Sequence, residues 1–215
     1  MSKKAITEEM LAELRIKATE SMSEKRKTHT LAVEQMAVRI GVIYAPEKTN
    51  VLRAAALLHD VTKELNLREQ LEMCEKYGIS VSENDMFAPK TFHAKTAAAL
   101  IESEFEAFAD EEVVSAVRWH TTGREGMTVV EKIIYLADYI DDSRKFADCV
   151  KLRDFFWGKD ISRMDEAEKE AHLRDTLIMS YDMTIGNLLD ENSPVAKDTF
   201  DARNELICER LKANI

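Results

Sequence analysis

Apolar residues recur at intervals of three and four positions along most of this chain. In residues 23–44, Val33, Met36, Ala37 and Ile40 follow this spacing, which places them on one face of an α-helix. Comparable stripes predict further helices from about residue 8, over residues 46–60 and 67–77, from residue 93 past residue 101, and over residues 110–120, 129–142, 165–190 and 197–213. Residues 79–90 have the composition of an irregular loop, and the aromatic stretch 151–164 fits no pattern clearly.

Residues typical of helix ends support this interpretation. Thr7 is suited to cap the first helix, and Thr128 and Glu131 have the spacing of a capping box. Pro46 suits a first turn, and Gly78 suits a left-handed C-terminal cap. Only 6 Gly and 3 Pro are present, few for a chain of many short strands. The sequence therefore predicts an all-α protein.

Length and composition predict one domain. The chain has 215 residues, of which 45% are hydrophobic, enough for one large helical core. Linkers rich in Ser, Gly or Pro are absent from the sequence. We expect a helical extension at 1–22, a core at 23–150 and C-terminal helices at 151–215 packed on the same domain.

Charge and cysteine content limit the possible partners and the compartment. The net charge of −10 argues against nucleic-acid binding, which relies on a basic surface. No apolar run approaches the roughly 20 residues that cross a bilayer, and the N-terminus does not resemble a secretion signal. Three widely spaced cysteines, an odd number, fit reduced thiols in the cytoplasm and not a zinc–thiolate site.

Four of the five histidines lie on or just after predicted helices, accompanied by two aspartates that follow apolar runs. These residues are His29, His59, Asp60, His93, His120 and Asp138. A single such histidine is usually an ordinary core residue with one hydrogen bond, but a buried carboxylate needs a partner. Because a shared cation would satisfy both carboxylates, we predict a metal site at the centre of the bundle.

Other candidates have simpler interpretations. His172 lies among charged residues, and we expect it to face solvent. Asp141 and Asp142 are interpreted either as charges behind the metal ligands or as a solvated helix end. Phe155–Trp157 is interpreted as a cover, a lid or an interface between subunits, and a homodimer is one of the states considered.

The spacing H…HD…H…H…D resembles the signature of the HD-superfamily phosphohydrolases. The segments AALLHDVTKEL and AVRWHTTGREGMTVVEKIIYLADYIDDSRKF are similar to one branch, the bacterial symmetrical bis(5′-nucleosyl)-tetraphosphatases. The resemblance extends over residues 28–146. It departs from the family at His93–Ala94, where members often have His-Gly, and this difference is expected to affect the local turn.

This resemblance implies an HD-type helical bundle that hydrolyses dinucleoside tetraphosphates to two nucleoside diphosphates. The implied metal ligands are His29, His59, Asp60 and Asp138. The implied catalytic residues are Asp60, Lys63, His93 and His120. The implied substrate-binding residues are Lys63, His93, His120, Thr121 and Arg144. The metal is expected to be iron, with manganese or zinc as alternatives, as one or two ions that activate water.

Three alternatives remain open from the sequence. Composition alone favours solvated surface cations at Lys63 and Arg144, whereas their fixed distance from the implied ligands favours a role in the site. Within the enzymes of the same superfamily, a 5′-nucleotidase or a guanosine-alarmone hydrolase is the second choice. A catalytically silent sensor of nucleotide or metal is the third, although such a protein would be expected to have lost a ligand, and all six positions are kept.

Overall fold

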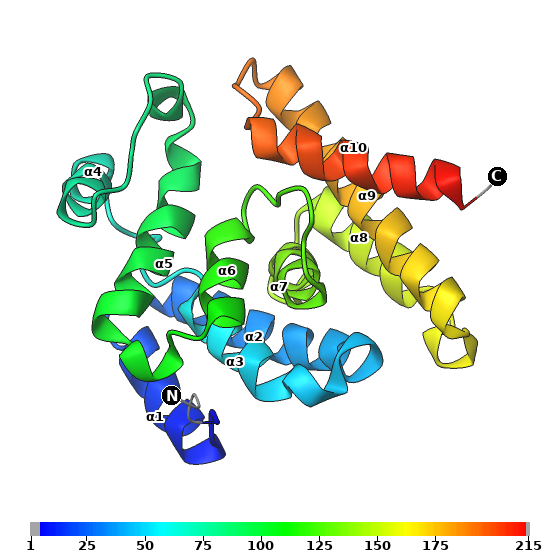
Figure 1. Ribbon diagram of the computed structural model, residues 1–215, viewed down its shortest axis with the longest axis horizontal. Coiled ribbons are helices and arrows are strands. Elements are labelled where there is room, and N and C mark those ends of the chain that lie inside the picture. The colour runs from blue at the N-terminus through cyan, green and yellow to red at the C-terminus, as the bar shows by residue number, and fades with distance from the viewer. Residues whose placement is uncertain (1–4, 214–215) are drawn as a thin grey trace.

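The protein is a bundle of helices joined by turns and short 3-10 segments (Figure 1). The computed structural model describes residues 5–213, and no strand occurs among them, which confirms the all-α prediction. The helices are α1 (Glu8–Thr19), α2 (Glu24–Tyr44), α3 (Thr49–Leu58), α4 (Leu67–Lys76), α5 (Phe92–Glu104), α6 (Glu111–Trp119), α7 (Val129–Ile140), α8 (Ala147–Trp157), α9 (Glu166–Asp190) and α10 (Lys197–Lys212). None of these described helices is both long and apolar enough to cross a bilayer.

The predicted caps explain several helix ends. The Thr7 hydroxyl accepts the amide of Met10, and the capping box of Thr128 and Glu131 is present at the start of α7. Gly78 follows α4 with φ +64°, the left-handed conformation that favours glycine. Local side-chain chemistry therefore determines where these helices begin and end.

Helix α7 occupies the middle of the molecule. It packs against α2, α3 and α6 on one side and against α8 and α9 on the other. Figure 1 shows this arrangement with α7 seen almost along its axis. Residues Val130, Ile133, Ile134 and Ala137 of α7 are fully buried. Because α7 is surrounded by other helices, a polar residue on it must find partners inside the bundle.

The N-terminal helix packs on the bundle. Helix α1 contacts α3, and Leu11 and Leu14 are buried there. Arg53 of α3 donates to the carboxylates of Glu8 in α1 and Glu34 in α2, at 2.6 and 3.0 Å. The division into an extension (1–22), a core (23–150) and C-terminal helices (151–215) stays a prediction.

The aromatic stretch that the sequence left unassigned forms most of α8. Phe156 is fully buried and belongs to the core. His172 of α9 stacks on it, with ring centroids 5.3 Å apart and an angle of 13° between the planes. The expectation that His172 faces solvent is therefore wrong: its side chain is buried, and its Nε2 lies 2.9 Å from the Phe156 carbonyl oxygen.

Candidate metal centre

The six predicted histidine and aspartate residues converge from five helices. His29 lies in the second turn of α2, and His59 and Asp60 directly follow α3. His93 is the second residue of α5, His120 directly follows α6, and Asp138 lies in the last turn of α7. Their side chains are buried or nearly so. Ala94, where the resemblance expects glycine, continues the helix, so the substitution leaves α5 regular at His93.

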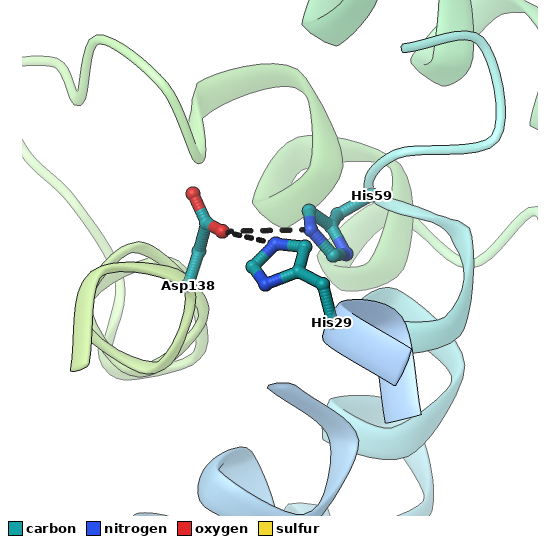
Figure 2. A group of neighbouring side chains, drawn as sticks. All are labelled: His29, His59 and Asp138. Carbon is teal, nitrogen blue, oxygen red and sulfur yellow. Dashed lines mark ion pairs between the residues drawn. The ribbon is translucent and has the colours of Figure 1, made fainter. Parts of the chain in front are cut away.

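His29, His59 and Asp138 form the first group of potential ligands, and their side chains point toward one another (Figure 2). One ligand atom from each lies within 4.8 Å of the others. Asp138 Oδ1 is 2.9 Å from His29 Nε2 and 3.6 Å from His59 Nε2. Both nitrogens are buried and make no hydrogen bond of good geometry. Buried nitrogens that face a carboxylate without such a bond fit a shared cation.

Asp60 connects this group to a second one. Its Oδ2 atom faces His59 Nε2 at 3.3 Å, and its Oδ1 atom faces His93 Nε2 at 3.3 Å and His120 Nε2 at 3.7 Å. His59, Asp60 and His120 also have ligand atoms within 4.8 Å of one another. The two potential ligand sets share His59, so the donor arrangement suits either one ion or two adjacent ions.

Main-chain carbonyls orient two of the imidazoles. His59 Nδ1 is 2.7 Å from the Ala56 carbonyl oxygen, and His120 Nδ1 is 2.7 Å from that of Val117. Because a carbonyl only accepts, each Nδ1 carries a proton and donates it. A neutral imidazole then presents the lone pair of Nε2 to the centre, the arrangement typical of metal-binding histidines.

Asp141 lies behind His29. Its side chain is fully buried, and its Oδ2 atom is 3.2 Å from His29 Nδ1, whereas the Asp142 side chain is 66% exposed and pairs with Arg39. The two interpretations of this acidic pair therefore each apply to one residue. Asp141 orients a potential ligand, and Asp142 is the solvated helix end.

Two cations and a hydroxyl lie beside the carboxylates and imidazoles. Arg144 Nη2 is 2.5 Å from Asp138 Oδ1, and Lys63 Nζ is 3.1 Å from His93 Nε2. The Thr121 hydroxyl lies 3.2 Å from His93 Nε2 and 3.1 Å from His120 Nε2. Neither Lys63 nor Arg144 is therefore a freely solvated surface cation, which excludes that alternative.

Arg26 is a member of the site that the sequence analysis did not identify. Its Nη1 donates to Asp60 Oδ2, and its Nε is buried without a partner among the described residues. In the sequence, Arg26 belongs to a charged run, EKRK, that resembles a solvated helix start. The available signal was its position three residues before His29, which places both side chains on one face of α2.

The pKa values of the buried imidazoles shift in opposite directions across the centre. Burial lowers the pKa of His59, but Asp60 and Asp138 outweigh it and raise that pKa to about 10. Burial, helped by Lys63 and His120, lowers the pKa of His93 to about 3, and burial also lowers the pKa of His120. The potential that favours a proton on His59 favours a divalent cation there as well.

The C-terminal helices hold the turn that follows His120. Gly123 has φ +64°, and a Cβ atom at this position would lie 1.9 Å from the Tyr181 hydroxyl of α9. Thr199 of α10 donates to the carbonyl oxygen of Thr122 at 3.0 Å. Only glycine fits this close approach, so α9 and α10 fix the loop that carries Thr121.

A cavity of about 750 Å³ opens beside the centre. It is lined by side chains of α2, of the turn after α3 and of the segment that follows α7, including His29, Lys63 and Arg144. Its volume is in the range of small-molecule binding sites, about 300–1,000 Å³. The centre is therefore accessible to a ligand of nucleotide size.

Comparison with known proteins agrees with this geometry. The HD domain profile matches residues 26–142. Proteins named "Bis(5′-nucleosyl)-tetraphosphatase, symmetrical" are 31% identical in Halalkalibacterium halodurans, over 88% of this chain and 92% of that protein, and 32% identical in Staphylococcus aureus, over 79% and 86%.

A solved structure is similar over nearly the whole chain. It is a protein from Clostridium acetobutylicum described as a predicted HD superfamily hydrolase involved in NAD metabolism, with a TM-score of 0.77 and 31% identity. The similarity covers 92% of this chain and 97% of that one. Together with the convergence of the histidines and aspartates, these matches show that the chain belongs to the HD-domain hydrolase family.

Proposed function

We propose that this protein is a metal-dependent hydrolase that cleaves dinucleoside tetraphosphates symmetrically into two nucleoside diphosphates. The observation that carries the proposal is the convergence of four imidazoles and two carboxylates beside a cavity lined by cations. The names of the relatives that match most of the chain support this choice of substrate.

The proposed ligands are His29, His59, Asp60 and Asp138. Their nitrogen and oxygen donors suit a divalent transition metal, and we propose iron, with manganese or zinc as alternatives, as one ion or two. When bound, such a cation acts as a Lewis acid and lowers the pKa of a coordinated water to about 7. Asp141 and the Ala56 carbonyl hold His29 and His59 in the required orientation.

The neighbouring cations are proposed to bind the phosphates. Arg144 and Lys63 extend from the carboxylate and imidazole groups toward the cavity and would neutralise charge on phosphoryl oxygens. Thr121, which contacts both His93 and His120, would donate a hydrogen bond to the same oxygens. An acidic chain can thereby bind a polyphosphate, because its positive potential is focused at one place.

Lys63 is the favoured proton donor to the leaving oxygen. The sequence analysis included His93 and His120 among the catalytic residues, but burial lowers the pKa of both imidazoles and keeps them neutral. Burial also lowers the pKa of Lys63, which makes its ammonium group a stronger acid. His93, within hydrogen-bond distance, would position that ammonium group.

Product analysis tests the proposal. Diadenosine tetraphosphate incubated with the metal-loaded protein should give ADP as the sole nucleotide product, measured by ion-exchange chromatography. AMP with ATP, or free phosphate, would contradict symmetrical cleavage and would favour a different phosphohydrolase of the same family. Binding of metal and nucleotide without any product would favour a silent sensor. Metal analysis of anaerobically purified protein tests the choice of iron.

A further inference from the structure

The cavity beside the metal centre is far more basic than the chain as a whole. Five cationic side chains and one carboxylate, Glu24, line it, whereas the chain carries a net charge of −10. The five cations are Lys25, Arg26, Lys63, Arg144 and Lys145. Arg26, Lys63 and Arg144 are half-buried and contact the metal centre, whereas Lys25 and Lys145 are exposed. Positive charge therefore extends outward from the centre.

Phe146 is the large apolar residue in the lining of this cavity. Its side chain is 71% exposed although its backbone is fixed: it is the N-cap of α8, and its carbonyl accepts the amide of Val150 at 3.0 Å. An exposed phenylalanine alone requires no explanation, and Phe87, 65% exposed, is another example. Phe146 differs because it lines the cavity that the phosphate-binding cations also line.

We propose that Phe146 is a stacking platform for a nucleobase, and that this cavity is the subsite for one nucleoside diphosphate half of the substrate. This inference rests on the proposed function. The phosphates of this half lie along Arg26, Lys63 and Arg144, and its base covers the exposed face of the Phe146 ring. Lys25 and Lys145 remain exposed and attract the anionic ligand.

Stacking predicts a tolerant base preference. Every nucleobase has an aromatic face, so a phenylalanine platform contributes affinity without reading hydrogen-bonding edges. The ring has no polar atom that could distinguish adenine from guanine. The structure therefore assigns affinity for any purine nucleoside diphosphate to this position and little discrimination between them.

The test compares ADP with pyrophosphate, which has the phosphates but no base. Dissociation constants are measured calorimetrically on the metal-loaded full-length protein. Phe146→Ala should weaken ADP binding about tenfold, the order expected for one lost base–aromatic contact, and should leave pyrophosphate binding unchanged. Phe146→Tyr should bind ADP like the wild type. Phe87→Ala is the matched control, because it removes an equally exposed ring outside the cavity lining.

A second variant reports contact without any turnover. In Phe146→Trp, ADP should quench the added tryptophan fluorescence and pyrophosphate should not. Equal effects of Phe146→Ala on ADP and pyrophosphate, or no effect on either, would overturn the inference, as would unquenched fluorescence of Phe146→Trp. These measurements do not depend on which bond is cleaved. Failure of symmetrical cleavage is seen instead in the products of the wild type.

Discussion

His59 and His172 are both buried imidazoles, but their surroundings differ in one respect. His59 donates from Nδ1 to a main-chain carbonyl, and its Nε2 faces the carboxylates of Asp60 and Asp138. His172 also bonds a main-chain carbonyl, but its ring lies against the aromatic ring of Phe156. Burial and a carbonyl partner are common to both, but only His59 has carboxylates within 4 Å of a ring nitrogen.

The difference reverses the behaviour of the two side chains. Burial lowers the pKa of both imidazoles, yet the carboxylates raise the pKa of His59 to about 10, while that of His172 stays below its usual value of 6.5. Burial alone therefore makes a histidine a neutral packing residue. Carboxylates at the same depth are what turn the position into a candidate cation site.

Replacement of Asp138 by alanine should have the largest effect. It removes the carboxylate shared by His29 and His59. Metal affinity and turnover should each fall more than about 100-fold, because loss of a residue that only supports a metal ligand already costs up to about 100-fold. Metal content and product formation measure the loss, and circular dichroism should show unchanged helix content. His172→Ala is the control and should keep its metal. Full activity of Asp138→Ala would refute the ligand assignment.

Replacement of Lys63 by alanine should separate substrate handling from metal binding. Lys63 contacts His93 and no carboxylate, so metal content should stay at the wild-type value. Loss of a cation on the transferring phosphoryl group should lower kcat/KM about 100-fold. Steady-state kinetics and metal analysis of the same preparation measure the two effects. Loss of metal in parallel with activity would instead give Lys63 a structural role.

Replacement of Asp141 by asparagine tests the support of His29. The variant keeps the shape but loses the charge that faces His29 Nδ1, and metal affinity should fall about 10- to 100-fold. Competition with a chelator measures that affinity. Asp142→Asn is the matched control at the adjacent, exposed position and should bind metal like the wild type. Equal affinities for both variants would place Asp141 outside the site.

The smallest expected effect concerns the pH dependence of stability through His172. Burial lowers the pKa of His172 in the folded protein, so its neutral form stabilises the fold fully above pH 6.5. As the pH falls below that value the unfolded chain takes up the proton first, and the free energy of unfolding decreases. Urea denaturation of His172→Gln, which can still donate to the Phe156 carbonyl, should show a weaker decrease. An identical pH dependence would mean that His172 titrates normally.

Periodicity predicted most helices because their stripes face a common core. Three features could be recognised directly in the sequence because they depend on neighbouring residues: helix α2, the capping box at Thr128 and the left-handed conformation of Gly78. The expected loop at 79–90 contains only short 3-10 segments. Helix α8 was not assigned, since its buried face contains only Cys149, Leu152 and Phe156, which gives a weak stripe.

The site was predicted less completely, because tertiary contacts decide it. The six histidine and aspartate positions could be found since each follows or interrupts an apolar stripe. Arg26 was missed, because its place three residues before His29 is only a weak signal within a charged run, and its partner Asp60 comes from α3. His172 was misjudged for the same reason: its charged sequence neighbours point elsewhere, and α8 covers its ring.

The turn at Gly123 has a consequence for where the functional unit ends. The matched HD region stops at residue 142, yet Tyr181 and Thr199, far beyond it, hold the backbone next to His120 and Thr121. A fragment excised at the edges of the matched region would retain every proposed ligand and still lack the wall against which this loop rests. The catalytic unit is therefore longer than the matched region. Transferring that region alone to another protein would carry over the proposed ligands but not the helices that hold the loop after His120 in place.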